Sequence, residues 1–126
     1  MKTNKDPRHL GRVRVMQQLF AWDFDPEGMV EEKDERLEKT VNIIQHVSEL
    51  DPHIIEAAPE RPLTDINKID LSVLRQALYE LFISKDVPVK VVVDEAVEIG
   101  KEYGTDTSGS FINGVLGKVI EKNKLA

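Results

Sequence analysis

Apolar residues recur every three or four positions along most of this chain, which is the spacing of one face of an α-helix. The clearest case is the segment 71–81, where leucines follow one another at intervals of three or four residues. Proline and glycine separate such segments, and no fixed repeat or low-complexity tract interrupts them. The pattern predicts an all-α fold of six to seven helices, and 126 residues fit a single domain with its own core.

The first helix is predicted from Pro7 to about Asp23. Asp6 is a suitable N-cap, and proline is tolerated at the first helical position, where no intrahelical partner exists for an N–H group. Leu10 begins its apolar stripe, and Phe24 at its end is expected in the core. A second stripe over 37–48 is predicted to end before Asp51-Pro52, and this pair is expected to begin another short helix.

The later boundaries follow from single residues. A short helix is predicted from about Thr64, and Asp70 is predicted as the N-cap of the leucine-rich helix. The valine run at 89–93 favours a strand by composition, but no second strand exists to pair with it, so we predict a helix that begins at Pro88. We expect Gly104 to be a left-handed helix cap and Gly114 to mark a close approach between helices.

Charge is distributed unevenly along the chain. The formal net charge is −6, yet residues 1–14 carry five cations against Asp6 alone, and residues 23–39 carry eight acidic side chains. An acidic body argues against a general duplex-DNA binder, because affinity for phosphate comes from clustered lysine and arginine. For a nucleic-acid partner, the pattern predicts docking at the basic edge only.

No enzyme signature is found in the sequence. It has no cysteine, no phosphate-binding glycine loop, no zinc-protease motif and no nucleophile elbow, so we expect neither catalytic residues nor a cofactor. A metal site from His46, Glu49 and His53 is conceivable by spacing, but Pro52 is expected to break the helix between them, so no metal is predicted. The acidic residues that recur from 94 to 102 are expected on a solvated face.

Location follows from the same observations. The first residues lack the apolar stretch of a signal peptide, and no segment approaches the ~20 apolar residues of a membrane span. We therefore expect a cytoplasmic protein.

Three side chains allow two interpretations each. Trp22 is more typical of a core position than of a base-stacking platform, whereas Phe20 either fills the core or stacks on a base beside the basic segment. Glu80 lies close to the apolar stripe, where it either caps a neighbouring helix or contacts a partner.

Residues 69–120 strongly resemble the C-terminal half of the NusB family of transcription antitermination factors. The matching blocks are LRQALYEL, DVPVKV, DEAVEIGKEYG and FINGVL. Residues 12–24 resemble the family's first helix more weakly, and 25–62 match in helical pattern only. The resemblance implies two packed helical subdomains, at about 6–60 and 62–124, within one RNA-binding domain over 1–126.

The resemblance also implies a function. A NusB-like factor pairs with a small-subunit ribosomal protein, binds single-stranded boxA-type RNA in nascent ribosomal RNA transcripts, and keeps it near RNA polymerase. The residues carried over to RNA binding, with the basic start of the chain, are Lys2, Lys5, Arg8, His9, Arg12, Phe20, Thr107, Ser110 and Phe111. Asp70 and Glu80 are predicted to contact the protein partner.

The basic segment is thinner here than in the family, because His9, Leu10 and Gly11 interrupt it and Ser110 is not a lysine. Weak binding of RNA alone and tighter binding with the partner are therefore expected. Arg8 and Arg12 are predicted to share an exposed face whose loss weakens RNA binding without destabilising the fold. Phe111 is as suited to the core as to stacking.

Two other functions remain open. One is a relative of the RNA-binding module of ribosomal RNA methyltransferases, although a chain ending at Ala126 leaves no room for a cofactor-binding domain. The other is a helical adaptor that binds only proteins.

Overall fold

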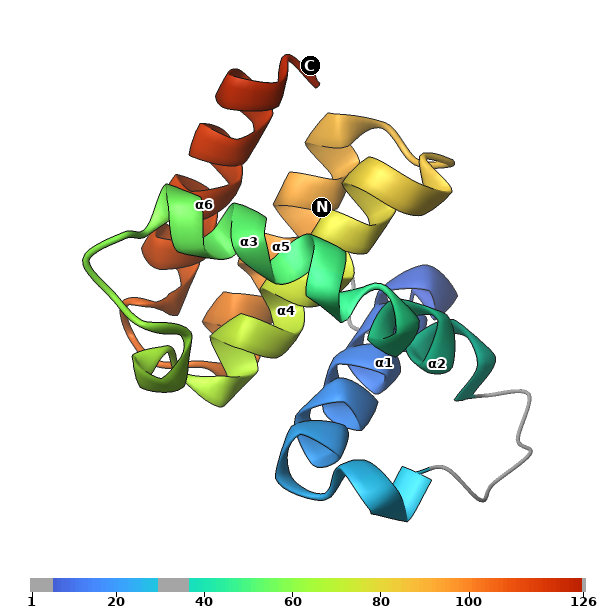
Figure 1. The fold of residues 1–126 in the computed structure, drawn as a ribbon. Helices are drawn as coiled ribbons and strands as arrows, with labels where there is room; N and C mark the ends of the chain where they lie inside the picture. The colour runs from blue at the N-terminus through green and yellow to red at the C-terminus, as the bar shows by residue number, and fades with distance from the viewer. Residues whose placement is uncertain (1–5, 30–36, 126) are drawn as a thin grey trace.

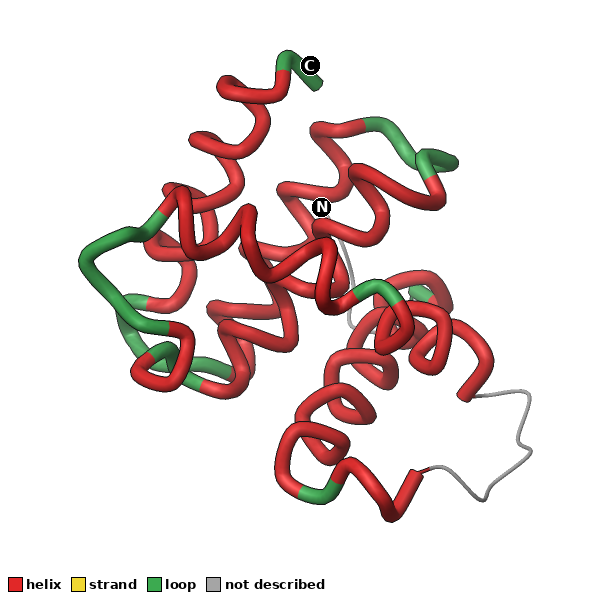
Figure 2. Tube along the Cα trace, viewed as in Figure 1, coloured by secondary structure: helices red, strands yellow, loops and turns green. Residues whose placement is uncertain are grey.

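The structure is a computed structural model that describes residues 6–29 and 37–125. Within these ranges it contains helices and no strand, as predicted (Figure 1, Figure 2). The six α-helices are α1 (Pro7–Phe24), α2 (Glu38–Gln45), α3 (Val47–Ala57), α4 (Lys68–Tyr79), α5 (Val89–Tyr103) and α6 (Ser108–Asn123). Short 3₁₀ turns cover Pro26–Met29 and Leu63–Asp65, and a π-helical turn, Glu80–Ser84, continues α4.

Helix α4 lies at the centre of the molecule and contacts α1, α3, α5 and α6. Its leucines are buried, and Leu74 and Leu78 are fully inaccessible, so the prediction for this stripe is confirmed. Helices α5 and α6 pack along each other, while α1 and α2 lie together at one end (Figure 1). The valine-rich segment is helical, as predicted, with Val92 in the core.

The division into two subdomains near residue 60 stays a prediction. Helix α3 belongs to the first half by sequence, but it packs against α4 and α6 of the second half. No helix among the described residues is long and apolar enough to span a membrane.

The predicted apolar stripe of α1 is right at its centre, where Val13 and Met16 are buried, and wrong at its two ends. Leu10 and Phe24 are 45% and 66% exposed, whereas the polar residues His9 and Arg12 face the interior. The first turns take this orientation because both polar side chains find buried carboxylate partners, described below. Trp22 is half-buried at the other end of α1, where the Arg75 guanidinium lies 5.5 Å from the centre of its ring.

Two predicted boundaries were also wrong. Pro52 lies inside α3, not at the start of a helix. Proline has no N–H to donate to the carbonyl of Ser48, four residues earlier. Ser48 and Pro52 both face solvent, so water can bind that carbonyl instead. Asn67, not Asp70, caps α4, since its Oδ1 accepts a hydrogen bond from the Ile69 amide at 2.8 Å.

The glycine predictions need correction too. Gly104 ends α5 with a φ of −92°, outside the left-handed region. A Cβ at Gly114 would meet nothing within 4 Å, so no neighbouring helix approaches there. The close approach is at Gly100, where a Cβ would collide with Cδ1 of Ile112 on α6.

Candidate nucleic-acid interface

The first turns of α1 divide their cations between two faces. Asp6 caps the helix, as predicted, by accepting a hydrogen bond from the Arg8 amide at 2.9 Å, and this bond lowers the pKa of Asp6. The Arg8 side chain is 85% exposed, and Arg14 is also exposed. Arg12, in contrast, is only 9% exposed. Arg8 and Arg12 therefore do not form the shared exposed face that their spacing predicted.

A surface cavity of about 380 Å³ opens beside this part of α1. Residues of α1, of α2 and of the turn before α5 line it, and the charged ones are Arg8, Arg12, Arg14, Lys39, Glu80 and Asp86. Cations outnumber carboxylates there, so the cavity suits an anionic group such as a phosphate. Arg14 was counted in the basic segment of the sequence but was not predicted as a site residue. Lys39 was not predicted as a site residue either, because its helix follows an acidic stretch of the chain.

Arg12 makes a buried two-pronged ion pair with Glu80. Its Nε and Nη2 donate to the two carboxylate oxygens at 3.3 and 2.9 Å, and its Nη1 lies 3.6 Å from Glu95 Oε1. Burial alone would lower the pKa of Arg12, but the bonds to Glu80 outweigh it and raise this pKa. Glu80 is 3% exposed, so it faces Arg12 and not solvent, and its predicted contact with a partner stays a prediction.

His9 lies between two carboxylates of α5. Its Nδ1 is 2.9 Å from Glu95 Oε2 and its Nε2 is 3.1 Å from Glu102 Oε2. The hydrogen bond to Glu95 raises the pKa of His9, burial opposes this, and the bond to Glu102 adds to the increase. Asp94, Glu98 and Glu102 are all exposed, as expected, but the Glu102 side chain, at 29% exposure, also contacts α1.

The other end of α1 carries aromatic side chains. The ring of half-buried Phe20 lies 4.9 Å from that of exposed Phe24, centre to centre. Asp23 beside them pairs with Lys68 at 2.6 Å and with Arg75 at 3.3 Å, and these two partners lower its pKa against the effect of burial. Phe20 is therefore partly available for stacking, on the same helix as Arg8.

The start of α6 is the third part of the predicted site. Thr107 and Ser110 are exposed, and the Ser110 hydroxyl donates to the Thr107 carbonyl at 3.2 Å. Phe111 is half-buried against the core, with the Arg61 guanidinium 4.4 Å from the centre of its ring. Thr107 follows Glu102 by five residues, so it lies within about 18 Å of the α1–α5 contact.

Two predicted residues lie outside the described part of the chain, namely Lys2 and Lys5. Asp70 is 3% exposed, its Oδ1 has no hydrogen-bond partner among the described residues, and burial raises its pKa. Its role toward a partner stays a prediction. His46 packs against Tyr79 and His53 against Phe82, and no group of three or more possible metal ligands occurs in residues 6–29 and 37–125.

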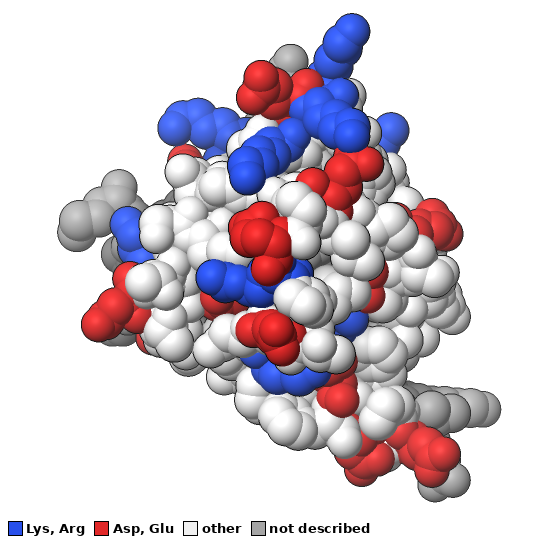
Figure 3. Space-filling model, turned by 60° about the vertical axis from the view of Figure 1, so that its left-hand side comes forward, with Lys and Arg blue, Asp and Glu red and all other residues white. Residues whose placement is uncertain are grey.

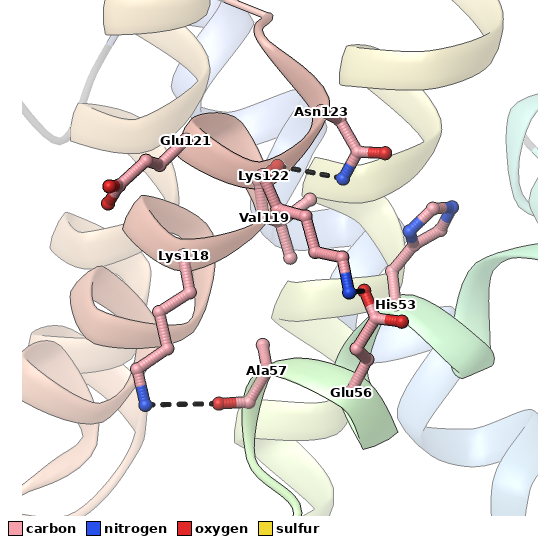
Figure 4. A pocket seen from close by; sticks show the side chains of 8 residues that line it. All are labelled: His53, Glu56, Ala57, Lys118, Val119, Glu121, Lys122 and Asn123. Carbon is pink, nitrogen blue, oxygen red and sulfur yellow. Dashed lines mark hydrogen bonds and ion pairs between the residues drawn. The ribbon is translucent and has the colours of Figure 1, made fainter.

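A groove between α3 and α6, of about 310 Å³, was not predicted (Figure 4). Its two lysines are already engaged, since Lys118 donates to the Ala57 carbonyl at 3.2 Å and Lys122 pairs with Glu56 at 2.6 Å. Figure 3 shows basic and acidic side chains close to one another on this face, with several basic ones at the top of the view. Lysines and glutamates are equal in number along this groove, whereas cations outnumber carboxylates in the cavity beside α1.

Comparison with known proteins decides the family. The model of the NusB family matches residues 9–121. This chain belongs to the NusB family. A transcription antitermination protein NusB of Agathobacter rectalis is 44% identical over 123 residues, which cover 85% of this chain and 94% of that protein. The NusB of Thermotoga maritima is 35% identical, with 94% of each chain covered.

Solved NusB structures share the fold. A crystal form of T. maritima NusB superposes with a TM-score of 0.79 at 33% identity, covering 97% of this chain and 94% of that one. A structure of the antitermination factors NusB and NusE in complex with dsRNA has a TM-score of 0.76 at 21% identity, covering 91% and 96%. The all-α NusB fold expected from the resemblance is thus confirmed, and NusB proteins are antitermination factors, not enzymes.

Proposed function

We propose that this NusB-family protein binds single-stranded boxA-type RNA together with a small-subunit ribosomal protein, and acts in the cytoplasm as an antitermination factor beside RNA polymerase. The observation that carries the proposal is the cationic cavity beside α1, with aromatic side chains at the other end of the same helix. Phosphates meet cations and unpaired bases stack on rings in single-stranded RNA recognition. The names of the relatives, and the solved complex of NusB with NusE and RNA, support it.

The phosphate contacts are assigned to Arg8, Arg14 and Lys39, because these cations border the cavity and are largely exposed. Arg12 lines the cavity but is itself largely buried. Its charge is neutralised by Glu80, so it contributes less to RNA affinity than its position in the sequence implies. Phe20 is the proposed stacking residue, and the exposed start of α6 at Thr107 and Ser110 is the proposed second edge of the site.

Titration of a labelled boxA-type RNA, with and without the ribosomal partner, tests the proposal. If about three to five phosphates are contacted, log K should fall against log salt with a slope near −2 to −3.5, at ~0.7 per phosphate. The Arg8→Ala variant should weaken binding and reduce this slope by about 0.7.

Lys90→Ala is the matched control for Arg8→Ala. The Lys90 side chain is 86% exposed, against 85% for Arg8, but it lies on α5 outside the cavity. Equal losses from both variants would show a diffuse charge effect and contradict the assigned site. Binding of the ribosomal protein without any RNA binding would favour the adaptor function instead.

A further inference from the structure

His9, Glu95 and Glu102, here called the His9 cluster, connect the first turn of α1 to α5. His9 is 2% exposed and Glu95 is 5% exposed, so the contact is buried. The two ring nitrogens lie 2.9 and 3.1 Å from carboxylate oxygens of different side chains. The histidine is thus enclosed by its own protein, and neither nitrogen is directed to solvent.

The geometry specifies the charge state of the ring. An ionised carboxylate only accepts hydrogen bonds, and a neutral imidazole has one N–H to donate. Only the doubly protonated imidazolium can donate to an ionised carboxylate at each nitrogen, and this arrangement therefore favours the cation. A neutral His9 would leave one nitrogen lone pair facing a carboxylate oxygen at about 3 Å, which is repulsive.

The charged groups around His9 favour this cation. From α5 it faces Glu95 and Glu102, and on its own helix Arg12 shares Glu95, at 3.6 Å from Nη1 to Oε1. Glu80, from the turn after α4, balances Arg12. Each buried cation in the cluster thus has a carboxylate of its own.

These charges position the beginning of α1 where apolar packing does not. Leu10 is 45% exposed, and Val13 is the first hydrophobic residue of the helix to reach the core. His9 and Arg12 therefore hold the first two turns against the interior, while Val13, Val15 and Met16 fix the rotation of the same helix further along. That rotation directs Arg8 and Arg14 toward the cavity.

We propose that His9 is a positioning residue for the RNA site and not a ligand of RNA: as an imidazolium it binds α1 to α5 so that Arg8 and Arg14 face the cavity. The proposal rests on the RNA-binding function proposed above. It also makes RNA binding dependent on pH. The pKa of His9 is raised above 6.5 by its bonds to Glu95 and Glu102, so the cluster is complete below about pH 6.5 and is lost as the pH rises through the folded-state value.

Glu102→Gln separates positioning from direct contact, because the two roles predict opposite effects. Removal of an acidic charge near an RNA ligand strengthens binding by simple electrostatics. Removal of a carboxylate that keeps His9 protonated weakens it, and more strongly at pH 8 than at pH 6. Glu98→Gln, an exposed carboxylate one turn earlier on α5, measures the generic effect of a lost charge.

The experiment is a titration of boxA-type RNA, without terminal phosphates, from pH 6 to pH 9 with the full chain. We expect wild-type affinity to fall about fivefold or more, the lower end of ordinary coupling between sites. Glu102→Gln should lose affinity at pH 8 relative to Glu98→Gln. His9→Arg, which has several donors and does not titrate in this range, should bind with little dependence on pH.

NMR titration of His9 in the free protein tests the cluster without RNA. We expect both ring nitrogens to be protonated at pH 6.5, and the backbone amides of residues 7–14 to change as His9 titrates. The proposal would be overturned by a His9 pKa at or below 6.5, or by backbone amides of residues 7–14 whose signals do not change as His9 titrates. Stronger RNA binding by Glu102→Gln would overturn it as well. If no variant binds RNA at any pH, the proposed function fails, and the amides alone then decide whether His9 positions α1.

Discussion

Replacement of Arg12 by methionine should destabilise the protein strongly, although the sequence alone suggested a harmless loss of an exposed cation. The variant leaves Glu80 buried, at 3% exposure, without its two-pronged partner. Breaking a buried ion pair in this way costs about 3–5 kcal/mol. Lys39 Nζ, 3.9 Å from Glu80 Oε1, compensates part of the charge, so we expect a value near the lower end, about 3 kcal/mol.

Thermal unfolding measures this change directly. For a chain of 126 residues, 1 kcal/mol corresponds to roughly 4 °C, so Tm should fall by about 12 °C. The double variant Arg12→Met with Glu80→Gln should recover most of the loss, because no unpaired charge remains buried. Lys90→Met is the control, since it breaks an exposed pair with Asp94 and should cost less than about 0.5 kcal/mol. The reasoning is refuted if Arg12→Met costs no more than the control, or if the double variant shows no recovery.

Three further predictions concern packing and burial. Gly100→Ala should lower the free energy of unfolding by about 1–3 kcal/mol through collision with Ile112, whereas Gly114→Ala, with open space around it, should raise it by about 0.5–1 kcal/mol in denaturant titrations. Burial raises the pKa of Asp70 in the folded protein above its ordinary value of 3.8. Ionisation of Asp70 therefore lowers the stability of the fold as the pH rises from 3.8 through the folded-state pKa. Asp70→Asn should flatten this part of the pH dependence of Tm and raise Tm at neutral pH. Phe111→Ala should cost about 2 kcal/mol, less than the 3–5 of a fully buried phenylalanine, and unchanged RNA affinity would remove it from the RNA site.

Helices α4 and α5 could be predicted because their buried residues follow a pattern that is visible within a short stretch of sequence. In α4, leucines at one-turn intervals face the core, and this spacing is visible in the sequence although Ser72, Arg75 and Gln76 are buried as well. The valine run of α5 could also be assigned, since the chain offers no second strand. In both cases the information lies within one helix.

The orientation of the first turns of α1 could not be predicted for the opposite reason. His9 and Arg12 count as surface residues by type, and the carboxylates that bury them are 68 to 93 residues away along the chain. Lys39 enters the candidate site by the same kind of long-range packing. Pro52 was misplaced because proline usually begins a helix, and no local pattern indicates that α3 continues through this exposed position.

The long range of the α1 contacts also affects the order in which the chain can fold during synthesis. Helix α1 is made first, but Glu95 and Glu102 follow His9 by 86 and 93 residues. At a synthesis rate of about 5–20 residues per second, roughly 5–20 s pass between the synthesis of α1 and that of its charged partners. The apolar residues of α1, Met16 and Leu19 among them, are covered earlier, because α1 packs mainly against α4 and α2. We therefore expect nascent chains that stop before α4 to be recognised by chaperones through the apolar face of α1, whereas chains that stop between α4 and α5 lack only the carboxylate partners of His9.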